Sequence, residues 1–443
     1  MGETVKDRPH QRREAGARSN PGLVVAYSSE SPCFHVLPLR KGRLALGRDE
    51  LAALHLADER VSRCHLEVEH DGTLWTVRDQ GSTNGTFLDG EPLAGAPSHG
   101  SPRVVRIGRT LLLPITNAAL YALHGLTARD GRVIGPTLRA VHEQIARIAR
   151  AGQGLLLTGG SGSGKEVAAR VFHEAGAGQR AGDRPFVALN CATVQRELAE
   201  RILFGARRGA YSGAVADAEG LIQSARGGTL FLDEIAELDA SVQAKLLRAL
   251  ETREVTPIGA LRPEAVDFRL CVATHKDLRA EVTSGRFRED LYFRIGRPEL
   301  CLPPLRERPE EIPWLVHQAA QSVSSADTPH AASAELVEAC LLRPWPGNVR
   351  ELLVEIRAAT LAAGDRASIL ATDLAEKGGI DLEQARRSVP PQASVEPDPI
   401  EVALAAEGGS ATRAAARLGI SRGKVRRFIE KQGLDVGASR KKG

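Results

Sequence analysis

The hydrophobic positions in the first quarter of the chain follow the pattern of short β-strands. Apolar and β-branched runs of four or five residues are separated by turn signals such as Asp71-Gly72 and Asn84-Gly85. Closely spaced strands joined by hairpin turns predict an all-β sandwich over residues 21–116. The clearest strands are expected at Leu23–Tyr27, Leu66–Glu69, Leu74–Val77 and Val104–Ile107.

From about Val133 the pattern changes to alternating helices and strands. Helical periodicity runs from Leu138 to Ile148, and helices alone are expected over residues 331–375. This alternation predicts an α/β domain with a mostly parallel sheet. Its strands are expected at Leu155–Leu157, Phe186–Leu189, Thr229–Leu232 and Leu270–Ala273.

The last segment, from Ile400 to Leu434, has the pattern of a short helical unit. A helix of small residues, then Gly419-Ile420-Ser421, then a basic helix is typical of a helix-turn-helix. A basic helix of a plain bundle is the alternative. The side chains expected to contact base edges or phosphates of double-stranded DNA are Arg422, Lys424, Arg426 and Arg427.

Composition and charge sharpen part of this picture. The length of 443 residues suggests about three domains, and the net charge of +4 names no partner. Residues 410–443 hold ten Lys or Arg against two acids, so a polyanion is the expected partner there, with a solvated tail as the alternative. Six scattered cysteines suit a reducing cytoplasm rather than a disulfide framework or a zinc site. No apolar run resembles a signal peptide or a membrane helix of roughly 20 residues, so a cytoplasmic location is expected.

A glycine-rich loop follows the first strand of the α/β pattern and precedes a helix. The spacing of Gly159, Gly164 and Lys165 is that of a P-loop, in which backbone N–H groups close around phosphates and the lysine reaches the β- and γ-phosphates. ATP is therefore the expected ligand. Glu166 stands where the general template has Ser or Thr, so magnesium ligation cannot be assumed there. The expected binding residues are Gly159, Gly160, Ser161, Gly162, Ser163, Gly164, Lys165 and Glu166.

A pair of acids, Asp233 and Glu234, ends a later apolar strand of the same domain. At the carboxyl end of a strand, Asp233 can hold hydrated Mg²⁺ and Glu234 can polarise the attacking water. A plain strand-end turn is the alternative, but the P-loop some 70 residues earlier favours a catalytic pair.

Residues from about 133 to 375 resemble the AAA+ domain of bacterial enhancer-binding proteins, the NtrC-type activators of sigma-54 RNA polymerase. The matching runs are Leu189–Cys191, Leu203–Gly205, Gly227–Ile235, Ala273–His275, Phe287–Leu291, Leu302–Arg308 and Trp345–Leu352. The resemblance implies that Asn190 restrains the catalytic glutamate, that Thr274 lies in the first sensor and that Arg350 is the second sensor. It also implies that Arg288 and Arg294 are arginine fingers completing a neighbour's ATP site, with a salt-bridged surface pair as the alternative. Family members are hexameric or heptameric when active.

The loop that contacts sigma-54 departs from the family pattern. The family has Gly-Ala-Phe-Thr-Gly-Ala, whereas residues 209–214 carry Tyr211 and Ser212 at the two central positions. The lost threonine methyl is worth about 0.8 kcal/mol if fully buried. Nearby, Ile222-Gln223 replaces the family's Phe-Glu, so a charge is missing. A DNA-binding ATPase regulator that no longer engages sigma-54 is therefore the alternative function, and a nucleic-acid remodelling ATPase is a weaker one.

The N-terminal β-rich segment resembles a forkhead-associated (FHA) domain, a family that binds phosphothreonine peptides. The matching pieces are Gly47-Arg48, Ser62–His65 and Ser82–Thr86. The resemblance implies that Arg48, Ser62 and Arg63 engage the phosphate, since guanidinium and hydroxyl groups bond phosphate oxygens well. Thr83 and Asn84 would hold the peptide backbone, and His65 would buttress the loops. A sandwich that has kept only packing contacts is the alternative.

The fold class expected from these features is multidomain: an all-β FHA sandwich, an α/β AAA+ domain with a helical lid, and an all-α helix-turn-helix. The expected function is phosphothreonine-gated, ATP-driven remodelling of sigma-54 polymerase by a ring on upstream DNA. The expected segments are a disordered arm (1–20), the FHA domain (21–116), a linker (117–132), the ATPase subdomain (133–309), the lid (310–375), a second linker (376–399) and the Fis-type helix-turn-helix with its basic tail (400–443).

Overall fold

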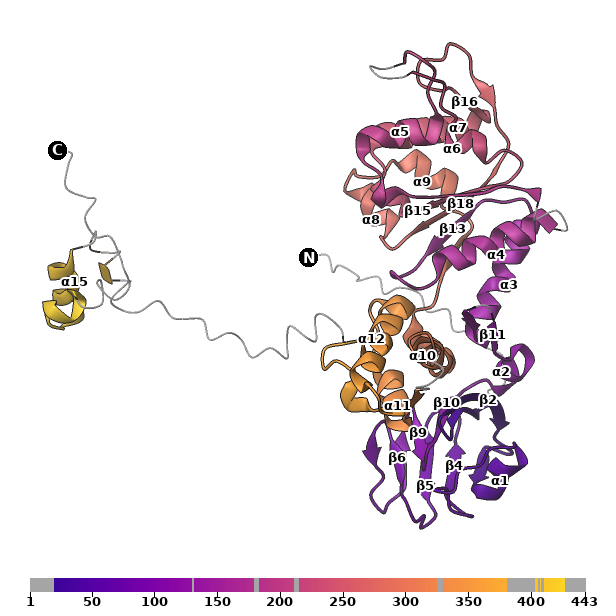
Figure 1. Cartoon of the computed structure of the whole chain (residues 1–443), viewed down its shortest axis with the longest axis vertical. Coiled ribbons are helices and arrows are strands. Elements are labelled where there is room, and N and C mark those ends of the chain that lie inside the picture. The colour runs from indigo at the N-terminus through magenta and orange to yellow at the C-terminus, as the bar shows by residue number, and fades with distance from the viewer. Residues whose placement is uncertain are drawn as a thin grey trace, which may run out of the picture. The chain divides into compact units, whose positions relative to one another are not determined.

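The computed structural model describes residues 20–129, 131–178, 183–210, 215–324, 330–380, 403–404, 407 and 410–426 (Figure 1). The chain divides into two compact units, residues 1–380 and 381–443. In the part of the chain that is described, no helix is both long and apolar enough to cross a membrane.

The N-terminal segment is a sandwich of two antiparallel sheets. The larger sheet has the order β2-β1-β10-β9-β6-β7 and the smaller has the order β3-β4-β5-β8. Helix α1 (Arg48–Ala53) follows β3. The strands are β1 (Gly22–Ser28), β2 (Ser31–Pro38), β3 (Arg43–Leu46), β4 (Leu66–His70), β5 (Trp75–Asp79), β6 (Thr86–Leu88), β7 (Glu91–Pro92), β8 (Ser98–Gly100), β9 (Val105–Ile107) and β10 (Thr110–Ile115).

Alternate side chains of β1 and β10 enter different apolar clusters. Leu23, Val25 and Leu112 belong to the core between the two sheets. Val24 and Leu111 point the other way, into a cluster shared with helices that follow much later in the chain. Strands β1 and β10 of the larger sheet are therefore buried on both faces.

The segment expected to be a linker, residues 117–132, carries regular structure. Helix α2 (Ala118–His124) begins at Asn117, whose side chain accepts a hydrogen bond from the Leu120 N–H. Strands β11 (Thr127–Arg129) and β12 (Arg132–Ile134) then pair as a hairpin. Asparagine is a favourable N-cap, which explains why a helix starts there.

The α/β domain contains a five-stranded parallel sheet with the order β14-β15-β18-β13-β19. Its strands are β13 (Leu155–Thr158), β14 (Phe186–Asn190), β15 (Thr229–Asp233), β18 (Arg269–Thr274) and β19 (Glu299–Cys301), with a small hairpin of β16 (Glu254–Val255) and β17 (Glu264–Ala265). The helices are α3 (Pro136–Arg150), α4 (Lys165–Ala177), α5 (Arg196–Phe204), α6 (Leu221–Ser224), α7 (Ala240–Thr252), α8 (Leu278–Thr283) and α9 (Glu289–Ile295).

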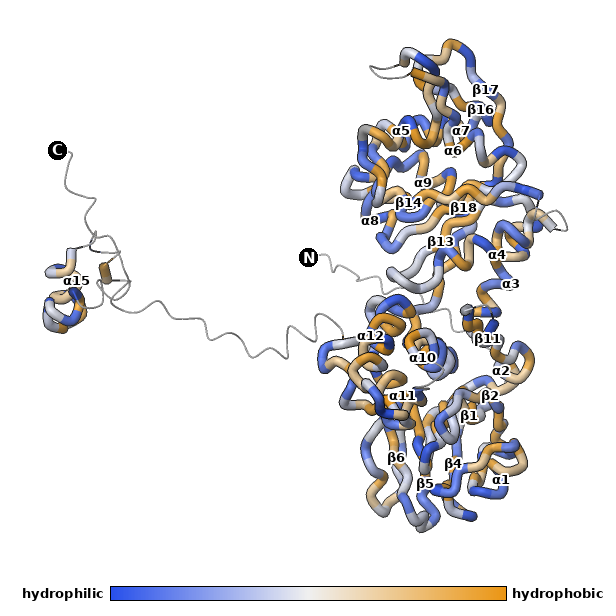
Figure 2. Tube along the Cα trace, viewed as in Figure 1, coloured by the Kyte–Doolittle hydropathy of each residue, from blue (hydrophilic) through white to orange (hydrophobic). Residues whose placement is uncertain are grey.

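Helices cover both faces of this sheet. On one face, Leu155 and Leu157 pack with α3 and α4. On the other face, Leu156 packs with the cluster that contains Leu203 of α5 and Leu246 of α7. Burial on both faces explains the continuous apolar runs of the strands, which Figure 2 shows most clearly along β18.

The lid is formed by helices α10 (Ile312–Gln321), α11 (Ala334–Leu342) and α12 (Asn348–Ala363). Two short strands, β20 (Ala331–Ala332) and β21 (Ser368–Ile369), pair in parallel beside them. Ser333 caps α11 by accepting a hydrogen bond from the Leu336 N–H. The helices expected over residues 331–375 are thus confirmed, with this small strand pair added.

The second unit is described over a short part of its length. Helix α15 (Ala411–Leu418) ends at Gly419, which has a left-handed conformation. Residues 422–426 are helical again. Ala414, Ala415 and Val425 are buried together, so the two helical segments share a small core.

All eight strands expected from the sequence are present, and helix α3 covers the predicted helical periodicity. The predicted fold class, with an N-terminal sandwich, an α/β domain and helical lid, and a helical C-terminal region, is confirmed.

Candidate nucleotide and phosphopeptide sites

The glycine-rich loop lies between β13 and α4, as the P-loop spacing predicted. Gly162 has a φ of +70°, and a Cβ atom there would stand 2.3 Å from the carbonyl oxygen of Gly347 in the lid. Only glycine fits this position, because it combines a left-handed backbone with close approach of another segment. The P-loop therefore lies in close contact with the lid at Gly162.

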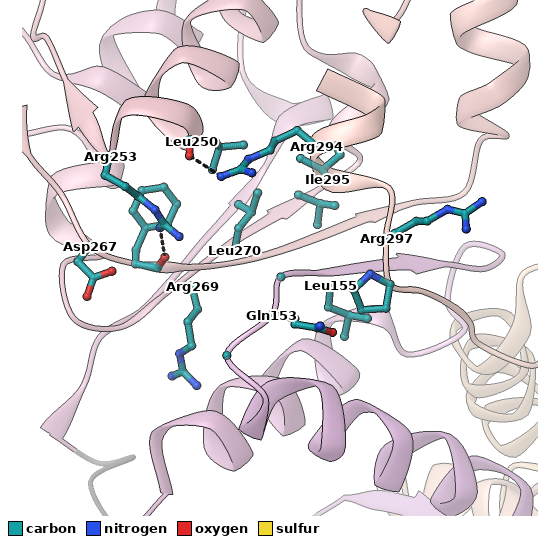
Figure 3. Close-up of a pocket in the computed structure, with 15 residues that line it drawn as sticks. Gln153, Leu155, Leu250, Arg253, Asp267, Arg269, Leu270, Arg294, Ile295 and Arg297 are labelled. Atoms are coloured by element: carbon teal, nitrogen blue, oxygen red, sulfur yellow. Dashed lines mark hydrogen bonds between the residues drawn. The ribbon is translucent and has the colours of Figure 1, made fainter. Parts of the chain in front are cut away.

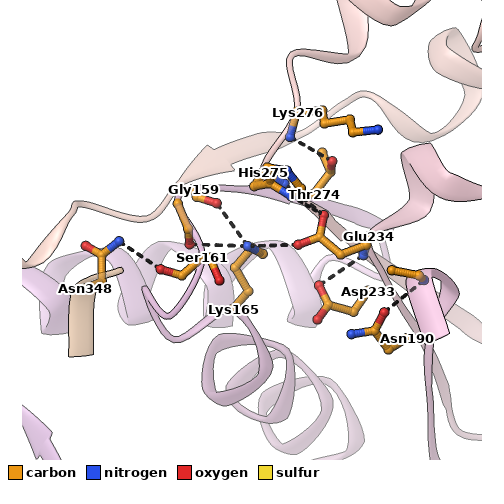
Figure 4. A network of polar contacts seen from close by, with 12 residues as sticks. Gly159, Ser161, Lys165, Asn190, Asp233, Glu234, Thr274, His275, Lys276 and Asn348 are labelled. Carbon is orange, nitrogen blue, oxygen red and sulfur yellow. Dashed lines mark hydrogen bonds and ion pairs between the residues drawn. The ribbon is translucent and has the colours of Figure 1, made fainter. Parts of the chain in front are cut away.

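Lys165, the first residue of α4, is buried and turned back into the loop. Its Nζ donates to the carbonyl oxygens of Gly159 at 3.0 Å and Gly160 at 3.3 Å, and it lies 3.6 Å from Oε1 of Glu234 (Figure 4). The ammonium group thus lies between the phosphate loop and the acidic pair, where it can neutralise phosphate charge.

Glu234 follows β15 in a left-handed conformation with a φ of +53°. Its Oε2 accepts hydrogen bonds from the Nδ1 of His275 at 2.7 Å and from the backbone N–H of His275 at 3.2 Å. Burial works to raise the pKa of Glu234, but the His275 hydrogen bonds and nearby Lys165 outweigh it, so the pKa is lowered. The group is an ionised carboxylate, as a base that polarises water requires.

Asp233 ends β15 and is half-buried beside Glu234. Burial and the neighbouring carboxylate raise its pKa, so a divalent cation would stabilise its charged form. Ser163 Oγ in the loop is buried and has no hydrogen-bond partner among the described residues. A carboxylate and a hydroxyl are oxygen ligands of the kind that Mg²⁺ takes, so these residues fit a magnesium–nucleotide complex.

Asn190 ends β14 and Thr274 ends β18, the two strands on either side of β15. Asn190 is in register with Asp233, but its Oδ1 accepts the N–H of Ala192 at 2.9 Å. The side chain that hydrogen-bonds Glu234 in this structure is His275, and the restraining role of Asn190 stays a prediction. Thr274 is fully buried, and its Oγ1 accepts the N–H of Lys276. Thr274 therefore fixes the turn that presents His275.

A cavity of about 470 Å³ is lined by the P-loop and the acidic pair and continues into an apolar part. Its polar part is lined by Ser161 to Glu166, Asn190, Asp233 and Glu234. The sequence did not single out the residues of the apolar part. They come from the α/β domain and from the helical lid. Its apolar lining residues are Val133, Ile134, Leu138, Val167, Leu315, Val349 and Leu353. A phosphate-binding end joined to an apolar end suits a nucleotide with its base.

The N-terminus of lid helix α12 contacts the P-loop directly. Asn348 Nδ2 donates to the Ser161 carbonyl at 2.9 Å, and the Val349 N–H donates to the Gly162 carbonyl at 3.2 Å. Arg350 Nη1 donates to Ser161 Oγ at 3.1 Å. Arg350 thus reaches the loop, as a second sensor must, and Asn348 is an additional contact that the sequence alone did not single out.

Glu166 and Arg308 each form an ion pair beside the P-loop. Glu166 is exposed and pairs with Arg170 at 2.9 Å, so its carboxylate is engaged at the helix surface. Arg308 is buried, pairs with Glu311 at 2.8 Å and donates to the Ser163 carbonyl at 3.0 Å. Arg308 therefore joins the P-loop to the start of the lid.

Neither expected arginine finger lines the nucleotide cavity of its own chain. Arg288 is exposed and forms a bidentate pair with Asp290 at 3.0 and 2.7 Å. Arg294 donates to the Leu250 carbonyl at 2.9 Å and lines a separate cavity of about 590 Å³ (Figure 3). Arg253, Arg269 and Arg297 line the same cavity, which makes it strongly basic.

The expected phosphopeptide residues meet at one end of the sandwich. Arg48 Nε donates to the Val61 carbonyl at 2.9 Å, and Ser62 Oγ accepts the Thr83 N–H at 3.1 Å. Asn84 Nδ2 donates to the Arg60 carbonyl at 2.8 Å. Arg48, Arg63, Thr83 and Asn84 are exposed, and Ser62 is half-buried. The three loops therefore form one surface with two guanidinium groups.

His65 is fully buried and joins these loops. Its Nδ1 accepts the Ser62 N–H at 3.1 Å, and its Nε2 lies 3.2 Å from the Gly85 carbonyl. Burial lowers the pKa of His65, so the ring is neutral and Nε2–H donates to Gly85. A Cβ atom at Gly47 would stand 1.7 Å from the Arg63 carbonyl, so this close approach also requires glycine.

Tyr211, Ser212 and Arg427 lie outside the described residues. Gln223 is described, and it is 4% exposed, with Nε2 donating to the Phe204 carbonyl at 2.9 Å. The missing charge at this position is therefore a change inside the domain and not on its surface. Arg422, Lys424 and Arg426 are exposed beside buried Val425.

Three segments of the chain match known domain families. Residues 133–300 match the Sigma-54 interaction domain, residues 44–111 the FHA domain and residues 306–388 the AAA+ ATPase lid domain. The fold and the nucleotide site thus define an AAA+ ATPase that carries an FHA domain.

The chain also has relatives among characterised regulators. It is 40% identical to the response regulator protein PilR of Pseudomonas aeruginosa over 318 residues, which cover 69% of this chain and 71% of PilR. It is 38% identical to the transcriptional regulatory protein ZraR of Escherichia coli over 303 residues, covering 67% and 68% of the two chains. The chain therefore belongs to the family of sigma-54-dependent transcriptional regulators with an AAA+ ATPase domain.

Solved structures agree with this assignment. NtrX from Brucella abortus, crystallised in complex with ATP, is 27% identical and superposes with a TM-score of 0.51 over 67% of this chain and 68% of NtrX. NtrX in complex with ADP gives a TM-score of 0.50 at the same identity.

Proposed function

We propose that this chain activates sigma-54 RNA polymerase from an upstream DNA site, using ATP hydrolysis in a hexameric or heptameric ring that phosphothreonine peptides gate. The observation that carries the proposal is the combination in one chain of the Sigma-54 interaction domain with a complete phosphate loop and acidic pair. The FHA match and the basic C-terminal helix supply an input and a DNA anchor.

Each residue of the nucleotide site has a role in this proposal. The loop N–H groups and Lys165 would hold the phosphates, Asp233 would hold Mg²⁺, and Glu234 would accept a proton from the attacking water. When bound, the metal would neutralise developing charge on the transferring phosphoryl. His275 orients the Glu234 carboxylate, since it makes two hydrogen bonds to one of its oxygens.

The arginines are proposed to act on a neighbouring subunit. Arg288 and Arg294 lie outside the cavity that their own chain supplies, so they would complete a site only between subunits. An arginine supplied in trans stabilises transition-state charge and is typically worth about 10³–10⁵ in rate. This requirement supports a ring in which ATP turnover depends on assembly.

The FHA surface is the proposed input. Arg48, Arg63 and Ser62 would bind the phosphate, and Thr83 and Asn84 would hold the peptide backbone. Arg48→Ala is expected to weaken binding of a phosphothreonine peptide by at least tenfold. Arg43→Ala removes an exposed arginine that pairs with Glu67 and Glu69 away from the loops, and it should bind the peptide normally. Equal affinity of the two variants would refute this site.

The output is proposed to reach sigma-54 through Tyr211 and Ser212 and DNA through Arg422, Lys424, Arg426 and Arg427. Purified protein, ATP and a phosphothreonine peptide should give open complexes at a sigma-54 promoter. If no open complex forms while ATP is hydrolysed, activation of sigma-54 is wrong.

The second candidate is a DNA-binding ATPase regulator that no longer engages sigma-54. Tyr211 and Ser212, which differ from the family's Phe and Thr, favour it. The two functions are distinguished by sigma-54 binding in ADP–metal fluoride, a mimic of the transition state. The first predicts a stable complex, and the second predicts none despite normal hydrolysis.

A further inference from the structure

The FHA sandwich and the AAA+ lid share one hydrophobic core. Every residue of β1 is buried, although one face of a sandwich sheet normally meets solvent. Val24, Ala26, Leu111 and Leu113 project from the outer face of the larger sheet into this shared core. The lid residues that meet them include Leu315, Val316, Ala319, Leu336, Val337 and Leu341.

Polar contacts fix the orientation of α11 on the sandwich. Arg106 of β9 donates through Nε to Glu338 Oε2 at 2.7 Å, and both side chains are about nine-tenths buried or more. The other oxygen of Glu338 accepts the Gly90 N–H at 3.2 Å. Arg103 donates to the carbonyl oxygens of Leu341 and Leu342, each at 2.8 Å. Because buried polar groups must find partners, these contacts define one docking geometry.

The same sheet is tied to the phosphopeptide loops. Asp58 is 4% exposed and accepts hydrogen bonds from the Arg60 N–H, the Arg109 N–H and Thr110 Oγ1, at 3.0, 2.7 and 2.8 Å. The Arg60 carbonyl in turn accepts a hydrogen bond from Asn84 Nδ2. On the lid side, the hydroxyl of Tyr27 in β1 donates to the carbonyl of Ala332, just before α11. Hydrogen bonds therefore connect the peptide loops to β10, and the neighbouring strand β1 contacts the lid.

The lid reaches the nucleotide from its other end. Helix α12 hydrogen-bonds the P-loop through Asn348, Val349 and Arg350. Helices α10, α11 and α12 share the core that also receives the sandwich. Figure 1 shows α11 beside β9 and α12 on the side of the lid that faces the α/β domain. A structural change at the P-loop can therefore reach the FHA domain through the packed side chains of the lid.

We propose that the FHA domain is docked on the lid as one rigid body, so that nucleotide at the P-loop and phosphopeptide at the FHA loops bind with linked affinities. This inference rests on the proposed function of the FHA surface. Linkage is reciprocal: if ADP changes peptide affinity by a factor, the peptide changes ADP affinity by the same factor. Couplings of this kind are typically about 5–150-fold.

The first test uses the full chain and ADP alone. Hydrogen exchange of β9, β10 and residues 58–65 is expected to change when ADP binds the wild-type chain. Glu338→Gln and, independently, Arg103→Gln should abolish this response while ADP still binds. Arg103 is exposed, so its variant tests the interface even if Glu338→Gln fails to fold. Arg357→Gln is the matched control, since Arg357 is exposed on α12 and hydrogen-bonds Ser322 within the lid at 3.3 Å; it should respond as the wild type does.

Two results of the first test would overturn the proposal. One is an absence of any ADP response in the sandwich of the wild-type chain. The other is an unchanged response in Arg103→Gln and Glu338→Gln, because the route would then not pass through α11.

The second test measures how tightly the chain binds a pool of fluorescent peptides, each with a central phosphothreonine and degenerate flanking residues. Its affinity for the wild-type chain should change by at least about fivefold when ADP is added, and this change should vanish in the two interface variants. A pool that binds equally with and without ADP overturns the linkage. A pool that does not bind at all refutes the phosphothreonine site, whereas the exchange response to ADP would still support the rigid docking.

Discussion

At the residue scale, the surroundings of the acidic pair shift the pKa values of the two carboxylates in opposite directions. Burial and Glu234 raise the pKa of Asp233, whereas His275 and Lys165 lower that of Glu234. The first is suited to a cation and the second to a proton from water. Two adjacent acids of similar chemistry thereby acquire different tasks.

Lys165→Ala and Glu234→Gln should separate binding from turnover. Lys165→Ala is expected to abolish ATP binding, because the charge that meets the phosphates is lost. Glu234→Gln is expected to retain ATP affinity and to lower kcat by about 10²–10⁴-fold, the range for a lost general base. Equilibrium binding of a fluorescent ATP analogue and steady-state hydrolysis measure the two effects. Equal losses of affinity in both variants would contradict these roles.

His142 of α3 should make stability depend on pH. Burial, and then the charges of Arg308, Arg139 and Arg132, lower its pKa from 6.5 to about 4. The unfolded chain therefore binds this proton at a higher pH than the folded chain does. The stabilising contribution of neutral His142 is full above pH 6.5 and decreases as the pH falls toward 4, by up to about 3 kcal/mol.

Urea unfolding of the wild-type chain and His142→Gln at pH 7 and pH 4.5 measures this contribution. The wild-type chain should lose more stability than the variant over this interval, since glutamine does not titrate. A parallel loss in both chains would show that His142 titrates normally.

At the scale of elements, α12 connects the lid to the P-loop through its first turn. Asn348 is 2% exposed and has a φ of +52°, a conformation that asparagine tolerates better than most residues. Its Oδ1 accepts the Leu305 N–H at 2.8 Å while Nδ2 reaches the Ser161 carbonyl. One side chain thus joins the lid, the segment leading to it and the phosphate loop.

Asn348→Ala is expected to lower the free energy of unfolding by about 1–3 kcal/mol, because buried backbone groups lose their partners. It should also weaken ATP binding, since the P-loop loses its support. Val354→Ala is the control on the same helix, where the side chain is 56% exposed. Urea unfolding and nucleotide titration check both effects, and identical behaviour of the two variants would refute the link.

Local patterns and long-range contacts differ in how well the sequence predicted them. The strands, the P-loop and the Asp233–Glu234 pair follow from short runs of residues, so they could be predicted. His275, Asn348 and Arg308 could not, because their partners lie far away in sequence and meet them only in the folded domain. The apolar run of β1 does not alternate with polar residues, and this pattern is typical of a strand buried on both faces. It could have indicated that the sandwich packs against another part of the chain.

At the scale of the whole molecule, the proposal that a neighbouring subunit completes the ATP site predicts complementation between inactive variants. Lys165→Ala chains lack the nucleotide but keep both arginines, and Arg294→Ala chains have the reverse defect. Each should be nearly inactive alone, and mixtures should recover ATP hydrolysis at interfaces that pair the two intact halves. Hydrolysis measured across mixing ratios tests this. A mixture no more active than its components would exclude an essential Arg294 in trans.

The burial of β1 on both faces also limits which domains could replace the FHA sandwich during evolution. A sensory domain joined by a free tether could be exchanged between regulators without change to the ATPase. Here, removal of the sandwich would uncover Leu315 of α10 and Leu336 of α11. We therefore expect substitutions on β1 and on these lid helices to accompany one another among related chains.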